Sequence, residues 1–125
     1  MFATEDEVYE LKNFVSQLNS MKESVVIVEG KRDSLALKKI GFTGKILEFN
    51  RFSGMINFVD SVAKQKNLII LFDGDNKGRH LTGKTIQLLQ RRTKLDLTFK
   101  KRLTKITKGK IRFIEQLGGF EFYLT

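Results

Sequence analysis

Two carboxylates one residue apart are the first feature of the sequence that could do chemistry. In LIILFDGDNKGRHLTGKT, Asp73 and Asp75 directly follow a run of large apolar residues. Carboxylates this close repel each other unless a cation lies between them, and Mg²⁺ prefers one or two carboxylates with water and phosphate oxygens. Glu29 follows a second apolar run, VVIV. We expect these three residues to bind Mg²⁺, with Mn²⁺ as the alternative ion; otherwise they only cap helices and shape turns.

The same stretch contains a competing phosphate-binding pattern. Residues 78–85, GRHLTGKT, match the G-x-x-x-x-G-K-[ST] pattern of a nucleotide-binding loop. In such loops the strand leads directly into the glycine-rich turn, whereas here several residues separate Phe72 from Gly78. The spacing of the apolar residues that follow predicts a helix instead. We therefore expect a chance match and keep nucleotide binding through Gly78 to Thr85 as a third hypothesis.

Alternating apolar runs predict the elements that position these residues. We expect strands at residues 25–28, 45–49, 67–72 and 95–99, and helices at residues 4–21, 33–40, 53–64 and 78–92. This order predicts an α/β fold with about four mainly parallel strands and helices on both faces. Ligands of such sheets bind beyond the carboxyl ends of the strands, where the strand order reverses. If the first and third strands are neighbours, Glu29 and the aspartate pair converge.

Length and composition limit the class of protein. A chain of 125 residues, 41% hydrophobic and 30% charged, fits a single domain. We divide it into an N-terminal helix at residues 1–23, a core at residues 24–99 and a basic extension at residues 100–125. The chain has no cysteine, which excludes disulfides and thiolate metal sites, and no apolar run approaches the roughly 20 residues of a membrane span. We expect a cytoplasmic protein with no membrane partner.

The charge of the chain points to its partner. The formal net charge is +9, and the excess of Lys and Arg lies in the middle and C-terminal parts, whereas the N-terminal segment is acidic. Such a field attracts polyanions, so we expect nucleic acid, RNA or DNA, as the partner. The alternative is a lysine-rich surface that serves only solubility.

Two motifs together resemble the signature of a known family. An apolar strand ending in EGKRD, residues 29–33, is followed further along the chain by DGDNKGR, residues 73–79. In content and order they resemble the motifs of the Toprim domain, which occurs in primases, topoisomerases and OLD-family nucleases. Size and motif details are most similar to the small stand-alone, primase-like Toprim proteins. The resemblance covers residues 24–99 and implies a Rossmann-like Toprim fold.

The resemblance also implies roles for individual residues. The motif glutamate matches Glu29, a general acid or base, and the metal-binding aspartates match Asp73 and Asp75. Topoisomerases of the family often carry a third aspartate where this chain has Lys77, which argues against a two-metal site. Asp33 fits the motif but also suits a helix cap. The cations expected to neutralise phosphate are Lys31, Arg32, Lys77 and Arg79, and the structural motif residues are Gly30, Asp33, Gly74 and Gly78.

The resemblance and the charge together imply a function. We expect Mg²⁺-dependent phosphoryl transfer on nucleic acid, with cleavage favoured over synthesis because no separate template-binding or ATPase module fits in this length. The basic segment from Lys100 to Arg112 is expected to help bind the substrate. The second hypothesis is a non-catalytic nucleic-acid-binding subunit of a larger DNA- or RNA-processing complex. In either case a protein partner is a candidate for further substrate binding.

Overall fold

A four-stranded parallel sheet forms the centre of the structure, a computed structural model that describes residues 3–124. Met1 and Phe2 of the predicted N-terminal segment, and Thr125 of the predicted extension, lie outside the described residues. The strands are β1 (Ser24–Val28), β2 (Ile46–Glu48), β3 (Asn67–Ile70) and β4 (Lys94–Asp96). The helices around them are α1 (Glu5–Ser20), α2 (Lys31–Lys39), α3 (Met55–Val62), α4 (Asn76–Leu89), α5 (Thr98–Ile106) and α6 (Glu121–Leu124), with 3₁₀ turns η1 (Phe49–Arg51) and η2 (Ile114–Phe120).

The strand order is β2-β1-β3-β4, and each neighbouring pair is parallel. The predicted α/β class with a four-stranded sheet is therefore confirmed. The chain adds β2 on one side of β1 and then places β3 and β4 on the other, so the strand order reverses between β1 and β3. In an open parallel sheet this reversal is where ligands bind.

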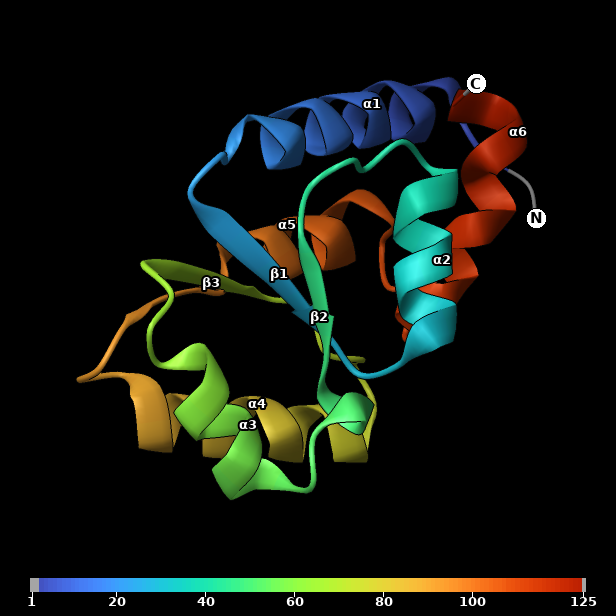
Figure 1. Cartoon of the computed structure of the whole chain (residues 1–125). Helices are drawn as coiled ribbons and strands as arrows, with labels where there is room; N and C mark the ends of the chain where they lie inside the picture. The colour runs from blue at the N-terminus through green and yellow to red at the C-terminus, as the bar shows by residue number, and fades with distance from the viewer. Residues whose placement is uncertain (1–2, 125) are drawn as a thin grey trace.

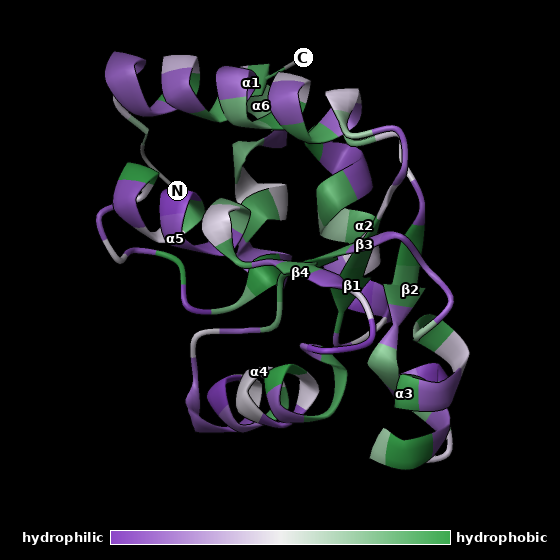
Figure 2. Cartoon of the chain, turned by 90° about the vertical axis from the view of Figure 1, so that its left-hand side faces the viewer, coloured by the Kyte–Doolittle hydropathy of each residue, from purple (hydrophilic) through white to green (hydrophobic). Residues whose placement is uncertain are grey.

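Each face of the sheet has its own hydrophobic core, because successive strand residues point to opposite sides. Val26 and Val28 pack with buried residues of α1, α2 and α5, whereas Val25 and Ile27 pack with those of α3 and α4. Figure 1 shows the first group of helices on one side of the sheet and α3 and α4 on the other. In Figure 2, hydrophilic and hydrophobic residues alternate around α1 and α4, as expected of helices that cover a core on one side only.

The end of the fourth strand differs from its predicted position. The strand stops at Asp96, and α5 begins at Thr98 rather than after Phe99. The Asp96 carboxylate accepts hydrogen bonds from the backbone N–H (2.8 Å) and the hydroxyl (2.6 Å) of Thr98. These contacts turn the chain out of the sheet. Phe99 is consequently part of α5 and is buried in the core beneath it.

The basic C-terminal extension folds back onto the body of the protein. Six of its apolar residues are buried in the core together with Phe99: Leu103, Ile106, Ile111, Ile114, Leu117 and Phe120. This anchoring carries residues 107–113 across the carboxyl end of β3. Within residues 3–124, every helix is too short or too polar to cross a membrane.

Candidate metal and phosphate site

Glu29 and Asp73 lie next to each other at the carboxyl edge of the sheet. β1 and β3 pair with Ile27 opposite Ile70, and extending that register puts Glu29 level with Phe72, one residue before Asp73. Both carboxylates line one hollow of about 280 Å³. The structure thus brings together two residues that are far apart in the sequence.

This hollow, which we call the acidic hollow, contains four carboxylates. Its lining residues are Glu29, Gly30, Lys31, Arg32, Asp33, Asn50, Asp73 and Glu115. They come from the ends of β1 and β3, the start of α2, the 3₁₀ turn η1 and the start of η2. Two of the carboxylates, Glu29 and Asp73, meet here because the parallel strands β1 and β3 end on the same edge of the sheet.

Asp73 is the most perturbed acid of the hollow. Burial, and then the charges of Asp33, Glu29 and Asp75, raise the pKa of Asp73 from an ordinary 3.8 to about 6. The backbone N–H of Ile114 donates a hydrogen bond of 2.7 Å to Asp73 Oδ1 and opposes this shift. One carboxylate oxygen is therefore fixed by the protein, while the repulsion from neighbouring acids would be relieved by a cation.

Asp33 has a structural contact as well as a place in the hollow. It lies in the first turn of α2, is only 7% exposed, and its Oδ2 accepts a hydrogen bond of 3.0 Å from the Gly30 backbone N–H. Burial chiefly, and then the charges of Glu29 and Glu115, raise the pKa of Asp33. Its helix-capping role is thus present in the structure.

Asp75 caps α4 instead of lining the hollow. Its Oδ1 accepts a hydrogen bond of 2.8 Å from the Gly78 backbone N–H. Gly78 itself has no room for a side chain, because a Cβ there would overlap the carbonyl group of Asp73. Gly74 donates its N–H to the Arg112 carbonyl at 2.6 Å. The tight path from β3 into α4 therefore depends on Gly78, and the Gly74 N–H ties this path to the segment after α5.

The predicted phosphate-binding cations surround these acids in different ways. Lys77 Nζ forms an ion pair of 2.7 Å with Glu29 Oε1, and this contact raises the pKa of Lys77. Arg32 is largely exposed and lies 4.0 Å from Glu115. Lys31 and Arg79 are exposed to solvent. Three of the four cations are thus free to move toward a phosphate, and Lys77 already neutralises part of the acidic charge.

The acids of the hollow fit a hard divalent cation by their chemistry. Carboxylate oxygens are the ligands that Mg²⁺ prefers, and burial together with the neighbouring carboxylates raises the pKa of Asp73, so a cation beside it would favour its charged form. Among residues 3–124, however, no three acidic or histidine side chains are grouped as ligands. Lys77 instead holds Glu29, and Asp75 serves as a helix cap.

The P-loop-like residues 78–85 do not form a loop. All of them lie within α4, and the Thr85 side chain is fully buried. Their backbone N–H groups beyond the first turn are used inside the helix, so they are not free to hold phosphate. The helical placement predicted from the apolar spacing agrees with the structure.

Three residues that were not predicted from the sequence as site residues lie at or beside the hollow. Asn50 and Glu115 line it, and Lys100 is attracted electrostatically to Asp73. Asn50 directly follows the predicted second strand, so its place at a strand end was a usable signal. Glu115 is remote from both motifs and reaches the site only through the fold. Lys100 begins the basic segment that was expected to bind substrate.

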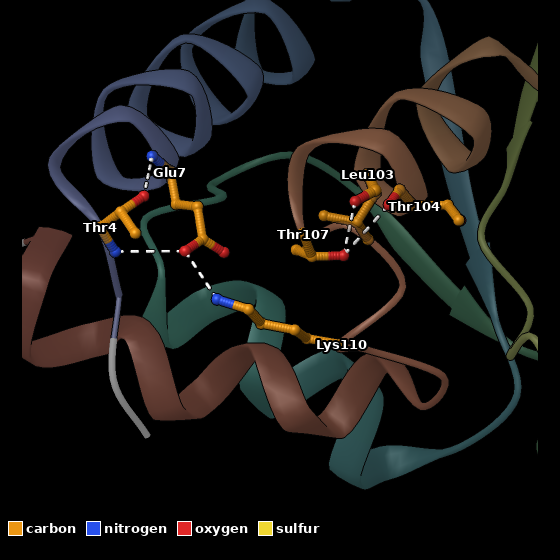
Figure 3. A network of polar contacts seen from close by, with 6 residues as sticks. All are labelled: Thr4, Glu7, Leu103, Thr104, Thr107 and Lys110. Atoms are coloured by element: carbon orange, nitrogen blue, oxygen red, sulfur yellow. Dashed lines mark hydrogen bonds and ion pairs between the residues drawn. The ribbon is translucent and has the colours of Figure 1, made fainter.

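A buried ion pair fixes the segment that contacts Asp73 and Gly74. Glu7 of α1 is 3% exposed, and its Oε1 accepts hydrogen bonds from Lys110 Nζ (2.7 Å) and the Thr4 backbone N–H (3.2 Å) (Figure 3). The bond from Lys110 lowers the pKa of Glu7 against the opposing effect of burial. This pair ties the N-terminal helix to residues 107–113, which reach the site.

Comparison with known proteins gives consistent matches over most of the chain. The family model for the Toprim domain matches residues 24–115, so the match extends beyond residue 99 and includes the segment that contacts Asp73. UPF0292 proteins of Thermococcus sibiricus and Archaeoglobus fulgidus are 32% and 30% identical; each alignment covers 87% of this chain, with 86% and 90% of the relatives. A solved structure, described as a putative protein from Aquifex aeolicus, is 29% identical with a TM-score of 0.68, over 85% of this chain and 96% of the other.

Proposed function

The chain belongs to the Toprim domain family, and from this membership and the acidic hollow we propose that it cleaves RNA or DNA in a Mg²⁺-dependent reaction. Toprim domains typically bind a divalent metal ion, and the family suggests a function connected with nucleic acid. The observation that carries the proposal is the meeting of Glu29 and Asp73 in one hollow at the strand-order reversal.

Each acid has a role that suits its surroundings. Asp73 and Glu29, with Asp75 nearby, would hold the ion, which supplies charge to stabilise the phosphate under attack. Glu29 lies at the edge of the hollow with 14% of its side chain exposed, so a bound water or a leaving oxygen can exchange a proton with it. Lys77 holds one oxygen of Glu29 and leaves the other available.

The surrounding cations suit a phosphodiester substrate. Lys31 and Arg32 line the acidic hollow, and Arg79 lies on the first turns of α4. A phosphate at the hollow would meet these positive charges and the positive end of the α4 dipole. The net charge of +9 supplies the longer-range attraction to a polyanion.

A cleavage assay with two matched glutamate variants tests this function. Labelled RNA and DNA would be incubated with Mg²⁺ or Mn²⁺ and wild type, Glu29→Gln or Glu23→Gln. We expect Glu29→Gln to lower the cleavage rate by about 100-fold or more, as loss of a general acid or base does. Glu23 flanks the opposite end of β1 and is 75% exposed in its pair with Lys66, so Glu23→Gln should cleave like wild type. Equal cleavage by Glu29→Gln and wild type would remove Glu29 from the mechanism.

One observation favours a second candidate, a non-catalytic nucleic-acid-binding subunit. Lys77 already neutralises Glu29, and the described residues contain no assembled three-ligand metal group. Such a subunit would bind nucleic acid, would cleave none of the substrates with either ion, and would keep its binding in Asp73→Asn. Turnover by the purified wild type decides against this candidate.

A further inference from the structure

A second cavity adjoins Asp73 on the side away from the acidic hollow. It measures about 540 Å³, within the range of roughly 300–1,000 Å³ that is usual for small-molecule sites. Its walls are the N-terminal half of α4, the helix α5 and the segment 109–112. We call it the cationic pocket; its lining includes Asp73, Arg79, Gly83, Lys100, Ile111 and Arg112.

Three positively charged residues line this pocket: Arg79, Lys100 and Arg112. Lys100 is partly buried, and burial lowers the pKa of its ammonium group while the charge of Asp73 acts in the opposite direction. The Lys100 Nζ atom lies 3.9 Å from the position that a Cβ on Gly74 would occupy. A desolvated cation is therefore held beside the acids, where an anionic group would find a strong partner.

The lining also has apolar members, and α4 leaves it open at Gly83. Ile86 and Ile111 contribute apolar surface, and Gly83 contributes no side chain. A Cβ on Gly83 would meet no atom within 4 Å. The pocket therefore combines cationic side chains beside Asp73 with the apolar side chains of Ile86 and Ile111 and an unobstructed stretch of α4 at Gly83.

We propose that the cationic pocket binds one nucleoside monophosphate unit, with its phosphate toward Lys100 and its base against Ile86 and Ile111. The proposal rests on the proposed function and narrows it: with its phosphate at Lys100, beside Asp73, a bound terminal nucleotide brings a strand end to the proposed cleavage site, so the protein would act at phosphorylated strand ends. A free nucleotide has the same binding chemistry, and the experiment separates the two sources.

Binding is measured by calorimetry and fluorescence anisotropy with four probes. They are AMP, a short 5′-phosphorylated oligonucleotide, the same oligonucleotide with a 5′-hydroxyl, and a circular oligonucleotide of that length. Oligonucleotides are measured in EDTA, so that no strand is cut; AMP is measured with and without Mg²⁺. Wild type should bind the phosphorylated strand about tenfold more tightly than the circle, the gain expected from one charged hydrogen bond.

Three variants, two expected to change binding and one expected to leave it unchanged, test whether the nucleotide binds in the cationic pocket. Gly83→Leu adds a side chain to the pocket lining at a position where a Cβ would meet no atom within 4 Å, and it should abolish the preference for phosphorylated ends, while its melting temperature stays equal or rises because leucine favours a helix. Gln87→Leu adds the same side chain to α4 at a position that does not line the pocket, and should bind like wild type. Lys100→Gln should lose about tenfold in affinity for the phosphorylated strand.

The outcomes separate this proposal from the cleavage function. Equal binding of phosphorylated and circular strands by a wild type that does not bind AMP, or an unchanged preference in Gly83→Leu, overturns the pocket proposal even if Mg²⁺-dependent cleavage is observed. A preference that Gly83→Leu abolishes supports the pocket even if no cleavage is found. Tight binding of AMP but equal binding of all strands assigns the pocket to a free nucleotide and overturns the strand-end role.

Discussion

At the scale of single residues, the acidic hollow gathers carboxylates around Asp73 whose mutual repulsion Lys77 relieves only in part. Asp73 shares its surroundings with Asp33, Glu29 and Asp75, and the only basic side chain paired with any of these four among the described residues is Lys77. Electrostatic repulsion of this kind is typical of sites whose charge is balanced by a ligand. It has measurable effects on the pH dependence of stability and on metal affinity.

Replacing Asp73 by asparagine should stabilise the protein at neutral pH. A raised folded pKa means that Asp73 contributes stability when protonated, below its ordinary value of 3.8, and that this contribution is lost as the pH rises through about 6. The asparagine side chain would keep an acceptor for the Ile114 N–H without the charge. After allowance for solvent screening we expect Asp73→Asn to gain about 1 kcal/mol at pH 7.5.

Denaturant unfolding of wild type and Asp73→Asn at pH 4 and pH 7.5 tests whether the substitution raises the free energy of unfolding. The advantage of Asp73→Asn should be small at pH 4 and largest at pH 7.5. Mg²⁺ should raise the melting temperature of wild type but not of the variant. If Asp73→Asn were less stable than wild type at pH 7.5, the charge of Asp73 would not destabilise the folded protein.

Lys77 should compete with a metal ion for Glu29. Removing its ammonium group in Lys77→Ala frees Glu29 Oε1, so we expect Mn²⁺ to bind roughly two- to fivefold more tightly, the scale of an exposed ion pair. Lys84→Ala, a lysine on the same helix, serves as the control and should leave Mn²⁺ affinity unchanged. Calorimetric titration measures both, and weaker Mn²⁺ binding by Lys77→Ala would show that Lys77 supports the ion instead.

At the scale of elements, the fourteen residues of α4 contribute to three parts of the molecule. Its first turn approaches the acidic hollow, its middle lines the cationic pocket, and its buried residues cover one sheet face. The sequence predicted this helix because its apolar spacing outweighed the P-loop-like letters. The first residue of α4 could not be predicted exactly, because Asp75 belongs to the motif and also caps the helix.

Two glycines of α4 should respond in opposite ways to alanine. Gly78→Ala forces a Cβ into the carbonyl of Asp73, and we expect a loss of about 3 kcal/mol or more, as for other severe backbone clashes. Gly83→Ala meets open space and should gain about 0.4–1 kcal/mol through helix propensity and reduced unfolded-chain entropy. Urea unfolding of the pair provides the measurement, and a neutral Gly78→Ala would mean that the turn before α4 relaxes easily.

The end of the fourth strand shows where element prediction stops. The alternation of residues 95–99 favours a strand, but the Asp96 carboxylate binds the N–H and hydroxyl of Thr98 and turns the chain into α5. A local side-chain contact of this kind competes with strand pairing and is not visible in hydrophobic alternation. The central strands were easier because long apolar runs identify buried parallel strands.

At the scale of the whole molecule, the ion pair between Glu7 and Lys110 joins the N-terminal helix α1 to the segment that follows α5. Removing the lysine leaves a nearly buried carboxylate without its partner, whereas removing the acid leaves a lysine whose side chain is 43% exposed. We therefore expect Lys110→Met to cost about 2–3 kcal/mol and Glu7→Gln about 1 kcal/mol.

The pH dependence of this pair runs opposite to that of Asp73. The pKa of Glu7 is lowered in the folded protein, so its contribution is present above its ordinary value of 4.5 and is lost as the pH falls below it. Thermal melts at pH 7 and pH 3 should show the cost of Lys110→Met shrinking at the lower pH. Lys101→Met, which removes an exposed lysine, is the control, and equal stability of both variants would contradict a structural role for the pair.

The sequence predicted the fold class and the meeting of Glu29 with Asp73, because both follow from strand-end position in a parallel sheet. It could not predict that Glu115 and Lys100 join them, since their place depends on how residues 98–120 pack against α1 and α2. Nor did charge patterning reveal the Glu7–Lys110 pair, because its members are separated by most of the chain.

The contacts of residues 112 and 114 also set the order in which the site forms during translation. Both motifs are synthesised before the Arg112 carbonyl and the Ile114 N–H that bind Gly74 and Asp73. A nascent chain with both motifs exposed therefore still lacks the backbone contacts that fix the acids. Completion of the acidic hollow is therefore tied to emergence of the segment after α5, the last part of the hollow to be synthesised.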